Sequence, residues 1–170
     1  MNIFIYKIMF NFQHNLDCYI RDAVIFWQLP MFKKLRVLSL RKYHINKLPD
    51  SIGELRYLRY LNLADTKIAS LPKSITDLIN LQIMILRNCS ELSELFPSMG
   101  KLISLRHLDI KGIKPIGEIM PSGMQELKYL ETLSNFIVGK DSGSHLKELK
   151  NLKLLCGELC ISQLENVTDS

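Results

Sequence analysis

Leu35-Arg36-Val37-Leu38-Ser39-Leu40 is a six-residue stretch that returns along the chain with its apolar positions unchanged. It reappears as Leu58-Arg59-Tyr60-Leu61-Asn62-Leu63, as Leu81-Gln82-Ile83-Met84-Ile85-Leu86 and as Leu105-Arg106-His107-Leu108-Asp109-Ile110. The leading leucines, at positions 35, 58, 81, 105 and 130, are 23, 23, 24 and 25 residues apart. An apolar pattern that recurs at a nearly fixed period is typical of folds built by stacking one small unit many times.

The apolar frame L-x-x-L-x-L at this period predicts a leucine-rich-repeat solenoid of the α/β class. We expect a horseshoe with a parallel β-sheet on its concave face, and loops and short helical turns on its convex face. Each strand is short, at residues 37–40 in the first unit. Side chains alternate along a strand, so Leu38 and Leu40 should point inward while Val37 and Ser39 point outward.

The second half of each unit has a different spacing. Its apolar residues step by three or four positions, which favours a loop followed by a short helical or 3₁₀ turn. In the first two units these residues are Ile45, Leu48, Pro49, Ile52 and Leu55, then Ile68, Leu71, Pro72, Ile75 and Leu78. One unit cannot bury its own leucines, so the units must stack around a shared core.

The frame is irregular in places. Its ninth position often holds an Asn or Cys that bonds to loop backbone inside the stack. Here the position holds Tyr43, Thr66, Cys89 and Ile113, of which Cys89 fits and Thr66 is a plausible substitute. After residue 133 the fifth unit breaks into a stretch at 136–144 that predicts a surface loop, because it is rich in Gly and Ser. A helical segment at 145–155 and a last strand at 158–161 should follow.

The composition predicts one domain that acts without metal or cofactor. The chain has 170 residues, and its net charge of +5 comes from dispersed charges of both signs, which does not resemble a nucleic-acid-binding tail. The cysteines at positions 18, 89, 156 and 160 form no C-x-x-C pair and have no His at zinc spacing. We therefore interpret them as reduced structural thiols, which fits an intracellular chain.

No segment of the sequence predicts membrane association or secretion. Residues 1–12 are apolar with a lone Lys7, but they lack the basic head and the cleavage site of a secretory signal. No apolar run reaches the roughly 18 residues that a membrane-spanning helix requires. We expect a cytoplasmic protein with no membrane partner.

Several stretches are more specific than the repeat frame requires. They include INKLPDSIGELRYLRYLNLADTKIASLPKSI at 45–75, MGKLISLRHLDI at 99–110, LSNFIVGKDSG at 133–143 and LCISQLENV at 159–167. These stretches closely resemble the repeat region of plant coiled-coil nucleotide-binding leucine-rich-repeat (NLR) disease-resistance proteins. On this resemblance, residues 1–22 are an unmatched segment. Residues 23–170 are a leucine-rich-repeat domain of about five to six repeats, truncated at its C-terminal end.

The resemblance implies a role in innate immunity. Family members are large intracellular receptors in which a nucleotide-binding module switches between ADP and ATP, while the repeats sense the pathogen and restrain the switch. This chain has no G-x-x-x-x-G-K-[S/T] phosphate loop, because Gly100-Lys101 and Gly139-Lys140 lack both the upstream Gly and the following Ser or Thr. We therefore expect no bound nucleotide and no other cofactor.

Outward strand positions supply the candidate binding residues, which are Arg36, Arg41, Lys42, Arg59, Tyr60, Ile83, Arg87, Arg106, His107 and Lys111. Equivalent positions on adjacent strands lie about 4.8 Å apart. One lane therefore reads Arg36, Arg59, Gln82, Arg106, and a second reads Arg41, Ala64, Arg87, Lys111. The cations predict a basic concave face that either docks on an acidic protein surface or only keeps the sheet solvated. The partner of such a face would be a nucleotide-binding module or a pathogen effector.

The preferred hypothesis is a non-enzymatic protein–protein interaction module of a plant disease-resistance receptor, acting in recognition or in autoinhibition. His107 has no nucleophile at a motif spacing, so a catalytic role is not indicated. A rival hypothesis is a scaffold or a substrate-recruiting subunit of a ubiquitin ligase outside immunity. A second rival is an anionic-surface or nucleic-acid binder that uses the arginine lanes, and a third is a non-functional truncated receptor fragment.

Overall fold

The computed structural model describes residues 29–95, 98–114, 120–121, 123–138 and 146–166. Within these ranges lie short strands and short 3₁₀ helices, labelled η. The strands are β1 (Val37–Ser39), β2 (Tyr60–Asn62), β3 (Ile83–Ile85), β4 (His107–Asp109), β5 (Thr132–Leu133), β6 (Asn135–Ile137) and β7 (Cys160–Ser162). The helices are η1 (Leu29–Phe32), η2 (Asp50–Glu54), η3 (Lys73–Asp77), η4 (Met99–Lys101), η5 (Met124–Glu126), η6 (Leu146–Asn151) and η7 (Leu164–Asn166).

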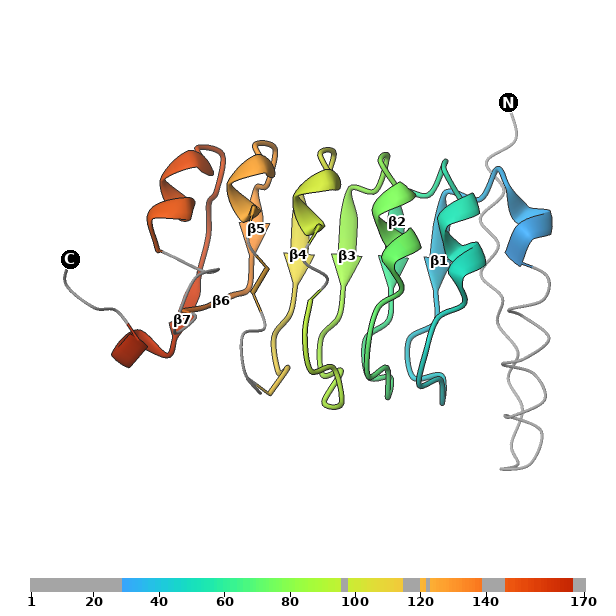
Figure 1. Ribbon diagram of the computed structural model, residues 1–170, viewed down its shortest axis with the longest axis horizontal. Helices are drawn as coiled ribbons and strands as arrows, with labels where there is room; N and C mark the ends of the chain where they lie inside the picture. The colour runs from blue at the N-terminus through green and yellow to red at the C-terminus, as the bar shows by residue number, and fades with distance from the viewer. Residues whose placement is uncertain (1–28, 96–97, 115–119, 122, 139–145, 167–170) are drawn as a thin grey trace.

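The first five strands form one parallel sheet in chain order. Its register pairs the central apolar residues of the repeats directly, as in Leu38 with Leu61, Leu61 with Met84 and Leu108 with Leu133. Figure 1 shows the strands side by side along the molecule, with the η helices η2 to η6 stacked in a second row parallel to them. The predicted leucine-rich-repeat solenoid with its parallel sheet is confirmed.

The core lies between the sheet and the row of η helices. Leu38 and Leu40 are buried while Ser39 is exposed, so the predicted alternation of the first strand is confirmed. From the second half of the unit Ile45, Leu48, Ile52 and Leu55 are also buried. The core runs without a break from Leu29 to Leu152. Because each repeat covers its neighbour, no single repeat could keep these side chains from water.

A left-handed residue ends the strand half of each of the first four repeats. Lys42, Asp65, Asn88 and Gly112 have φ values of 64°, 60°, 59° and 78°. A Cβ at position 112 would lie 2.3 Å from Oδ1 of Asn88, so any larger residue there would displace the Asn88 side chain. The chain therefore turns out of the sheet in the same way in each of these repeats, although the residue types differ.

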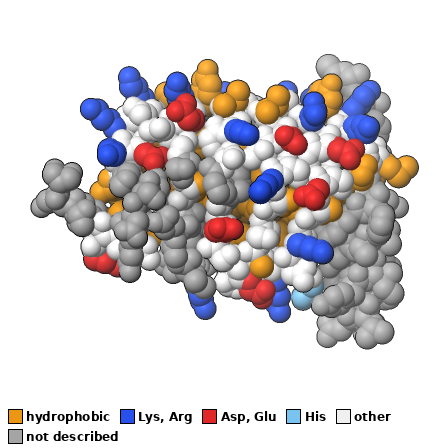
Figure 2. Space-filling model, viewed as in Figure 1, with side chains coloured by type: hydrophobic (Ala, Val, Ile, Leu, Met, Phe, Trp, Pro, Cys, Tyr) orange, Lys and Arg blue, Asp and Glu red, His pale blue; other side chains and the backbone are white. Residues whose placement is uncertain are grey.

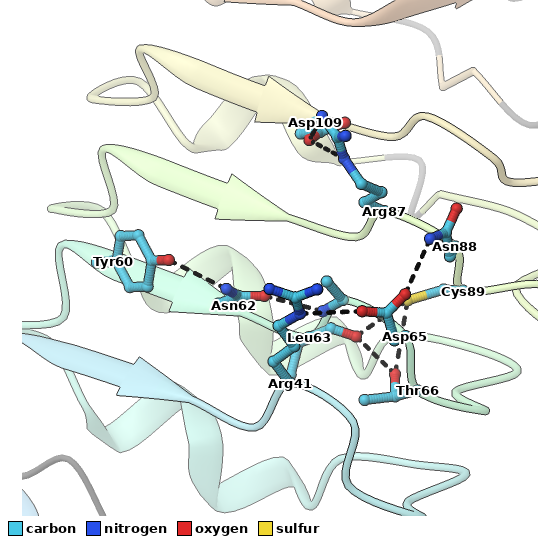
Figure 3. Close-up of polar contacts among 11 residues, drawn as sticks. Arg41, Tyr60, Asn62, Leu63, Asp65, Thr66, Arg87, Asn88, Cys89 and Asp109 are labelled. Carbon is cyan, nitrogen blue, oxygen red and sulfur yellow. Dashed lines mark hydrogen bonds and ion pairs between the residues drawn. The ribbon is translucent and has the colours of Figure 1, made fainter.

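Thr66 and Cys89 bond to loop backbone inside the stack, as the repeat frame predicts. The Thr66 hydroxyl donates to the carbonyl of Leu63 at 2.8 Å, and the Cys89 thiol donates to the same carbonyl at 3.2 Å (Figure 3). Burial raises the pKa of the Cys89 thiol. A buried thiol with a raised pKa is a structural group rather than a nucleophile.

The end of the array differs from the sequence prediction. Residues 136–138 belong to the predicted surface loop, yet Phe136, Ile137 and Val138 are buried. Strand β6 pairs with β7 in a second, two-stranded parallel sheet, which places Phe136 opposite Ile161. Three consecutive apolar residues outweigh the Gly and Ser that follow them, because burying them stabilises the last repeat. The rest of the predicted loop, at 139–144, lies outside the described residues.

Strand β7 also differs from its predicted position. It spans residues 160–162 rather than 158–161, and Ile161 is 36% exposed instead of pointing into the core. Cys160, on the same strand, is exposed. Glu158, which is exposed, takes the place that a buried leucine holds in earlier repeats. The helical spacing of Leu146, Leu149 and Leu152 corresponds to η6 and the residue that follows it.

Candidate protein-binding face

The ten candidate residues lie on strands β1 to β4 or within three residues of a strand end, on one face of the sheet. This surface is called the sheet face below. Backbone hydrogen bonds hold its first lane together, since the carbonyl of Arg36 accepts from the N–H of Arg59 and the carbonyl of Arg59 accepts from Gln82. The same pattern continues beyond Arg106 to Glu131 and Cys156. The lane is therefore longer than predicted, and it includes an acidic residue.

Three of the candidate arginines are paired with carboxylates of the next repeat. Nε of Arg41 lies 2.9 Å from Oδ2 of Asp65. Arg87 contacts Asp109 at 2.7 Å, and Arg106 contacts Glu131 at 2.9 Å. Each pair is largely exposed, so its contribution to stability is at most about 1 kcal/mol. Their larger effect is on the charge of the sheet face, which is less basic than the sequence lanes suggest.

Four candidate cations have no ion pair among the residues that the structure describes. They are Arg36, Lys42, Arg59 and Lys111, and all four are exposed. Arg36 and Arg59 precede the adjacent strands β1 and β2 at the same repeat position. The free positive charge of the lanes is therefore concentrated toward the first two repeats.

Tyr60, Ile83 and His107 are half-buried and form a central lane, because β2, β3 and β4 pair them in register. The Tyr60 hydroxyl accepts a hydrogen bond from Nδ2 of Asn62 at 3.0 Å, which fixes the ring on the sheet face. Ala64, which the second lane placed outward, is buried at 4% exposure. The first repeat approaches Ala64 closely at this point, because the carbonyl of Ala64 accepts a hydrogen bond from the N–H of Lys42.

His107 is held by neighbours on the next strand. Its Nδ1 lies 2.9 Å from Oγ1 of Thr132, and its Nε2 lies 3.8 Å from Oε2 of Glu131. The order Thr–His–Glu resembles a nucleophile, a base and an orienting acid. However, 3.8 Å is too long for a hydrogen bond, and the carboxylate is already bound by Arg106. We interpret His107 as a non-catalytic residue of the sheet face.

Asp65 joins three repeats through its side chain. One carboxylate oxygen accepts from Nε of Arg41 in the first repeat, and the other accepts from Nδ2 of Asn88 in the third repeat at 2.8 Å (Figure 3). These contacts lower the pKa of Asp65, with the Asn88 hydrogen bond contributing most and Arg41 next. Sequence reasoning missed this cluster, although 24 residues, close to one repeat period, separate Arg41 from Asp65.

Replacing Asp65 with asparagine is expected to flatten the acid side of the stability curve. A carboxylate with a lowered pKa stabilises the fold above its ordinary pKa of 3.8, and the contribution is lost as pH falls through the lowered value. Asp65→Asn removes this dependence. Denaturant melts at a series of pH values from neutral to about pH 3 would measure the slope. Curves of the same slope for the variant and the wild type would contradict the role of Asp65.

The parallel sheet, its register and the regular stack of turns define a leucine-rich-repeat module. Comparison with known proteins agrees, because residues 17–168 match the family described as leucine-rich repeat region. The chain belongs to this family. A solved leucine-rich-repeat protein of Leptospira interrogans matches 81% of the chain, and 35% of that protein, with a TM-score of 0.66 at 25% identity. A TDR receptor structure matches 82% of the chain with a TM-score of 0.55 at 21% identity, over 23% of its own length.

The sequence relatives are plant disease resistance proteins. The chain is 49% identical over 133 residues to an Arabidopsis thaliana protein named for disease resistance, and this match covers 78% of the chain. It is 38% identical over 136 residues to a late blight resistance protein homolog of Solanum demissum, over 76% of the chain. The chain spans only 9% and 10% of the lengths of these two relatives.

Two further features bear on function. Among the described residues, no helix is long and apolar enough to cross a membrane. No group of three or more His, Cys, Asp or Glu side chains within the same ranges is placed to hold a metal ion.

Proposed function

We propose that the chain is the interaction module of a plant disease-resistance receptor and binds a protein partner through the sheet face. The observation that carries the proposal is the adjacent pair Arg36 and Arg59, exposed and without ion pairs among the described residues. Half-exposed Tyr60 and Ile83 lie next to this pair on β2 and β3. Cations beside aromatic and aliphatic side chains are a frequent composition of protein-binding sites.

The partner has an acidic surface, because the free cations of the face would attract and orient it. Two kinds of partner fit the resistance names of the relatives. A nucleotide-binding module of the same receptor would be restrained by docking here, and a pathogen effector would be recognised here. The module acts by binding, in the cytoplasm, without cofactor and without catalysis. Nucleic acid is a less suitable partner for the sheet face, because Arg41, Arg87 and Arg106 already form ion pairs with carboxylates of the next repeat.

Reversing the charge of the free arginine pair is expected to abolish partner capture. The variant Arg36→Glu with Arg59→Glu should fold normally, because both side chains are exposed. Capture of a co-expressed nucleotide-binding module from a related resistance protein should fall at least about tenfold, mostly through slower association. Added salt should also weaken capture of the module by the wild-type chain, because salt screens the attraction between the arginines and an acidic partner.

The matched control is Lys47→Glu with Lys67→Glu, which reverses two exposed charges on the loops that follow the first two strands. This control should capture the module as well as the wild type does. Unchanged capture by the arginine variant, with its fold intact by circular dichroism, would exclude the sheet face as the docking site. An equal loss in both variants would show an effect of net charge rather than of a specific face.

A further inference from the structure

A second surface of the solenoid carries charge and apolar side chains in a regular row. It consists of the two residues that precede each leading leucine and is called the basic–apolar edge below. Its members are Lys33 and Lys34, Arg56 and Tyr57, Ile79 and Asn80, Ile103 and Ser104, Lys128 and Tyr129, and Lys153 and Leu154. This row lies outside the sheet face.

The fold places these residues along one side of the molecule. They occupy the turn between each η helix and the following strand. In these turns the N–H of Leu58 donates a hydrogen bond to the carbonyl of Leu55, and the N–H of Leu81 donates to the carbonyl of Leu78. Nδ2 of Asn80 donates to the carbonyl of Arg56 at 2.8 Å, which joins the turns of neighbouring repeats. In Figure 1 these turns line up along the top of the molecule. The row is thus continuous in space although it is scattered in sequence.

The apolar members of the edge are unusually exposed. The exposed fractions are 58% for Tyr57, 51% for Ile79, 56% for Ile103, 59% for Tyr129 and 50% for Leu154. Among the described residues, eight large hydrophobic side chains are exposed, and these five are the majority of them. Figure 2 shows hydrophobic side chains along the same top margin, interspersed with Lys and Arg. Apolar side chains gathered in this way, rather than scattered, mark a contact surface.

The charge of the edge has one sign. Five of its twelve residues are Lys or Arg, and none is acidic. None of these five cations forms an ion pair within the described ranges. Acidic residues do lie nearby, because Asp50, Glu54 and Asp77 of η2 and η3 share a shallow cleft with Lys33 and Arg56. Tyr57 of the edge lines the same cleft. The three carboxylates belong to the η helices, and the twelve residues of the edge itself include no acidic residue.

We propose that the basic–apolar edge binds the surface of an anionic lipid bilayer. Tyr, Ile and Leu side chains can enter the headgroup region, while Lys and Arg on the same row interact with anionic lipid. The turns that carry the row line up along one margin of the molecule (Figure 1), so its side chains can contact one flat surface together. Nucleic acid would use the cations but leave the apolar side chains exposed to water. Charge complementarity and shape together therefore favour lipid.

Lipid binding at the edge departs from the sequence-based expectation of no membrane partner. That expectation rested on contiguous apolar runs, and the edge has none, because its apolar residues recur only once per repeat. Binding at the edge is peripheral, so the lack of a spanning helix among the described residues does not bear on it. The edge is distinct from the sheet face, so this inference does not depend on the proposed function.

Co-sedimentation of the full chain with vesicles tests the proposal. Wild-type chain should sediment with mixed phosphatidylcholine–phosphatidylserine vesicles and stay in solution with phosphatidylcholine alone. A charge variant, Arg56→Gln with Lys128→Gln and Lys153→Gln, should reduce the partition coefficient at least about tenfold. An apolar variant, Tyr57→Ser with Tyr129→Ser and Leu154→Ser, should reduce it to a similar extent. All six residues are exposed, so folding should be unchanged by circular dichroism.

The matched control neutralises three exposed lysines away from the edge, Lys47→Gln with Lys67→Gln and Lys114→Gln, and should bind like the wild type. Wild-type chain that stays in solution with anionic vesicles at low salt would overturn the proposal. Equal losses in the control and in the charge variant would also overturn it. Loss with the charge variant but not with the apolar variant would overturn the lipid assignment and indicate a soluble polyanion instead.

Discussion

Replacing Leu61 with alanine is expected to lower the free energy of unfolding by about 2–5 kcal/mol. Leu61 has no exposed surface, and it lies between Leu38 on β1 and Met84 on β3 in the sheet register. The substitution removes buried apolar contacts and leaves a cavity that the neighbouring repeats cannot close without distorting the sheet. Denaturant melts of the full chain, with the wild type as reference, would measure the change.

Leu154→Ala is the matched control for this prediction, because it removes the same atoms from a side chain that is 50% exposed. Its effect on the unfolding free energy should stay below about 0.5 kcal/mol. A comparable loss of stability in the two variants would contradict the assignment of inward and outward positions. It would mean that the leucine frame does not determine which side chains form the core.

Replacing Phe136 with alanine is expected to destabilise the chain by about 3–5 kcal/mol. The Phe136 side chain has no exposed surface, and β6 pairs it with Ile161 of β7. If residues 136–138 formed a surface loop instead, the same substitution would change stability by less than about 0.5 kcal/mol. The variant therefore distinguishes the buried strand from the loop that the Gly and Ser content of the segment predicts.

Tyr129→Ala serves as the comparison for Phe136→Ala, because it deletes a large aromatic side chain that is 59% exposed, in the turn just before the fifth repeat. It should leave the unfolding free energy nearly unchanged. Equal melting curves for wild type and Phe136→Ala would show that the second sheet does not contribute to the core.

The repeat frame was sufficient to predict the core and the strand order. Leucines at 38, 61 and 108 recur at the repeat period, and all three are buried at the same position of their strands. With regular spacing, the assignment of a buried position in one repeat supports the same assignment in the other repeats, because stacked repeats must share one geometry. The inward bonds of Thr66 and Cys89 followed from the same frame.

The ion pairs of the sheet face could not be predicted in the same way. Arg87 and Asp109 occupy different positions of their repeats, and they meet only because the long arginine side chain reaches across to the next strand. The sequence lanes show which charges lie on the face, but they do not show which arginine pairs with which carboxylate. Counting the cations of the lanes thus overestimated the unpaired positive charge of the sheet face. It also missed that this charge is concentrated at Arg36 and Arg59.

The exposed apolar row was also missed, and for a related reason. Tyr57, Ile103 and Leu154 are each within two residues of a buried or half-buried leucine. In the sequence, these exposed apolar residues therefore cannot be distinguished from the apolar residues of the core. Only the turn geometry, which points them away from the leading leucine, separates the two sets. The sequence therefore predicts how the repeats stack more reliably than which outer surface the side chains form.

The central claim is that a protein partner docks on the sheet face, while the basic–apolar edge has a separate role. The most direct measurement is the affinity of a nucleotide-binding module from a related resistance protein for two variants of the full chain. Arg36→Glu with Arg59→Glu should weaken binding at least about tenfold, which corresponds to about 1.4 kcal/mol. Arg56→Gln with Lys128→Gln and Lys153→Gln should leave the affinity unchanged. The reverse result, with affinity lost only in the edge variant, would contradict the assignment of the sheet face as the protein-binding surface.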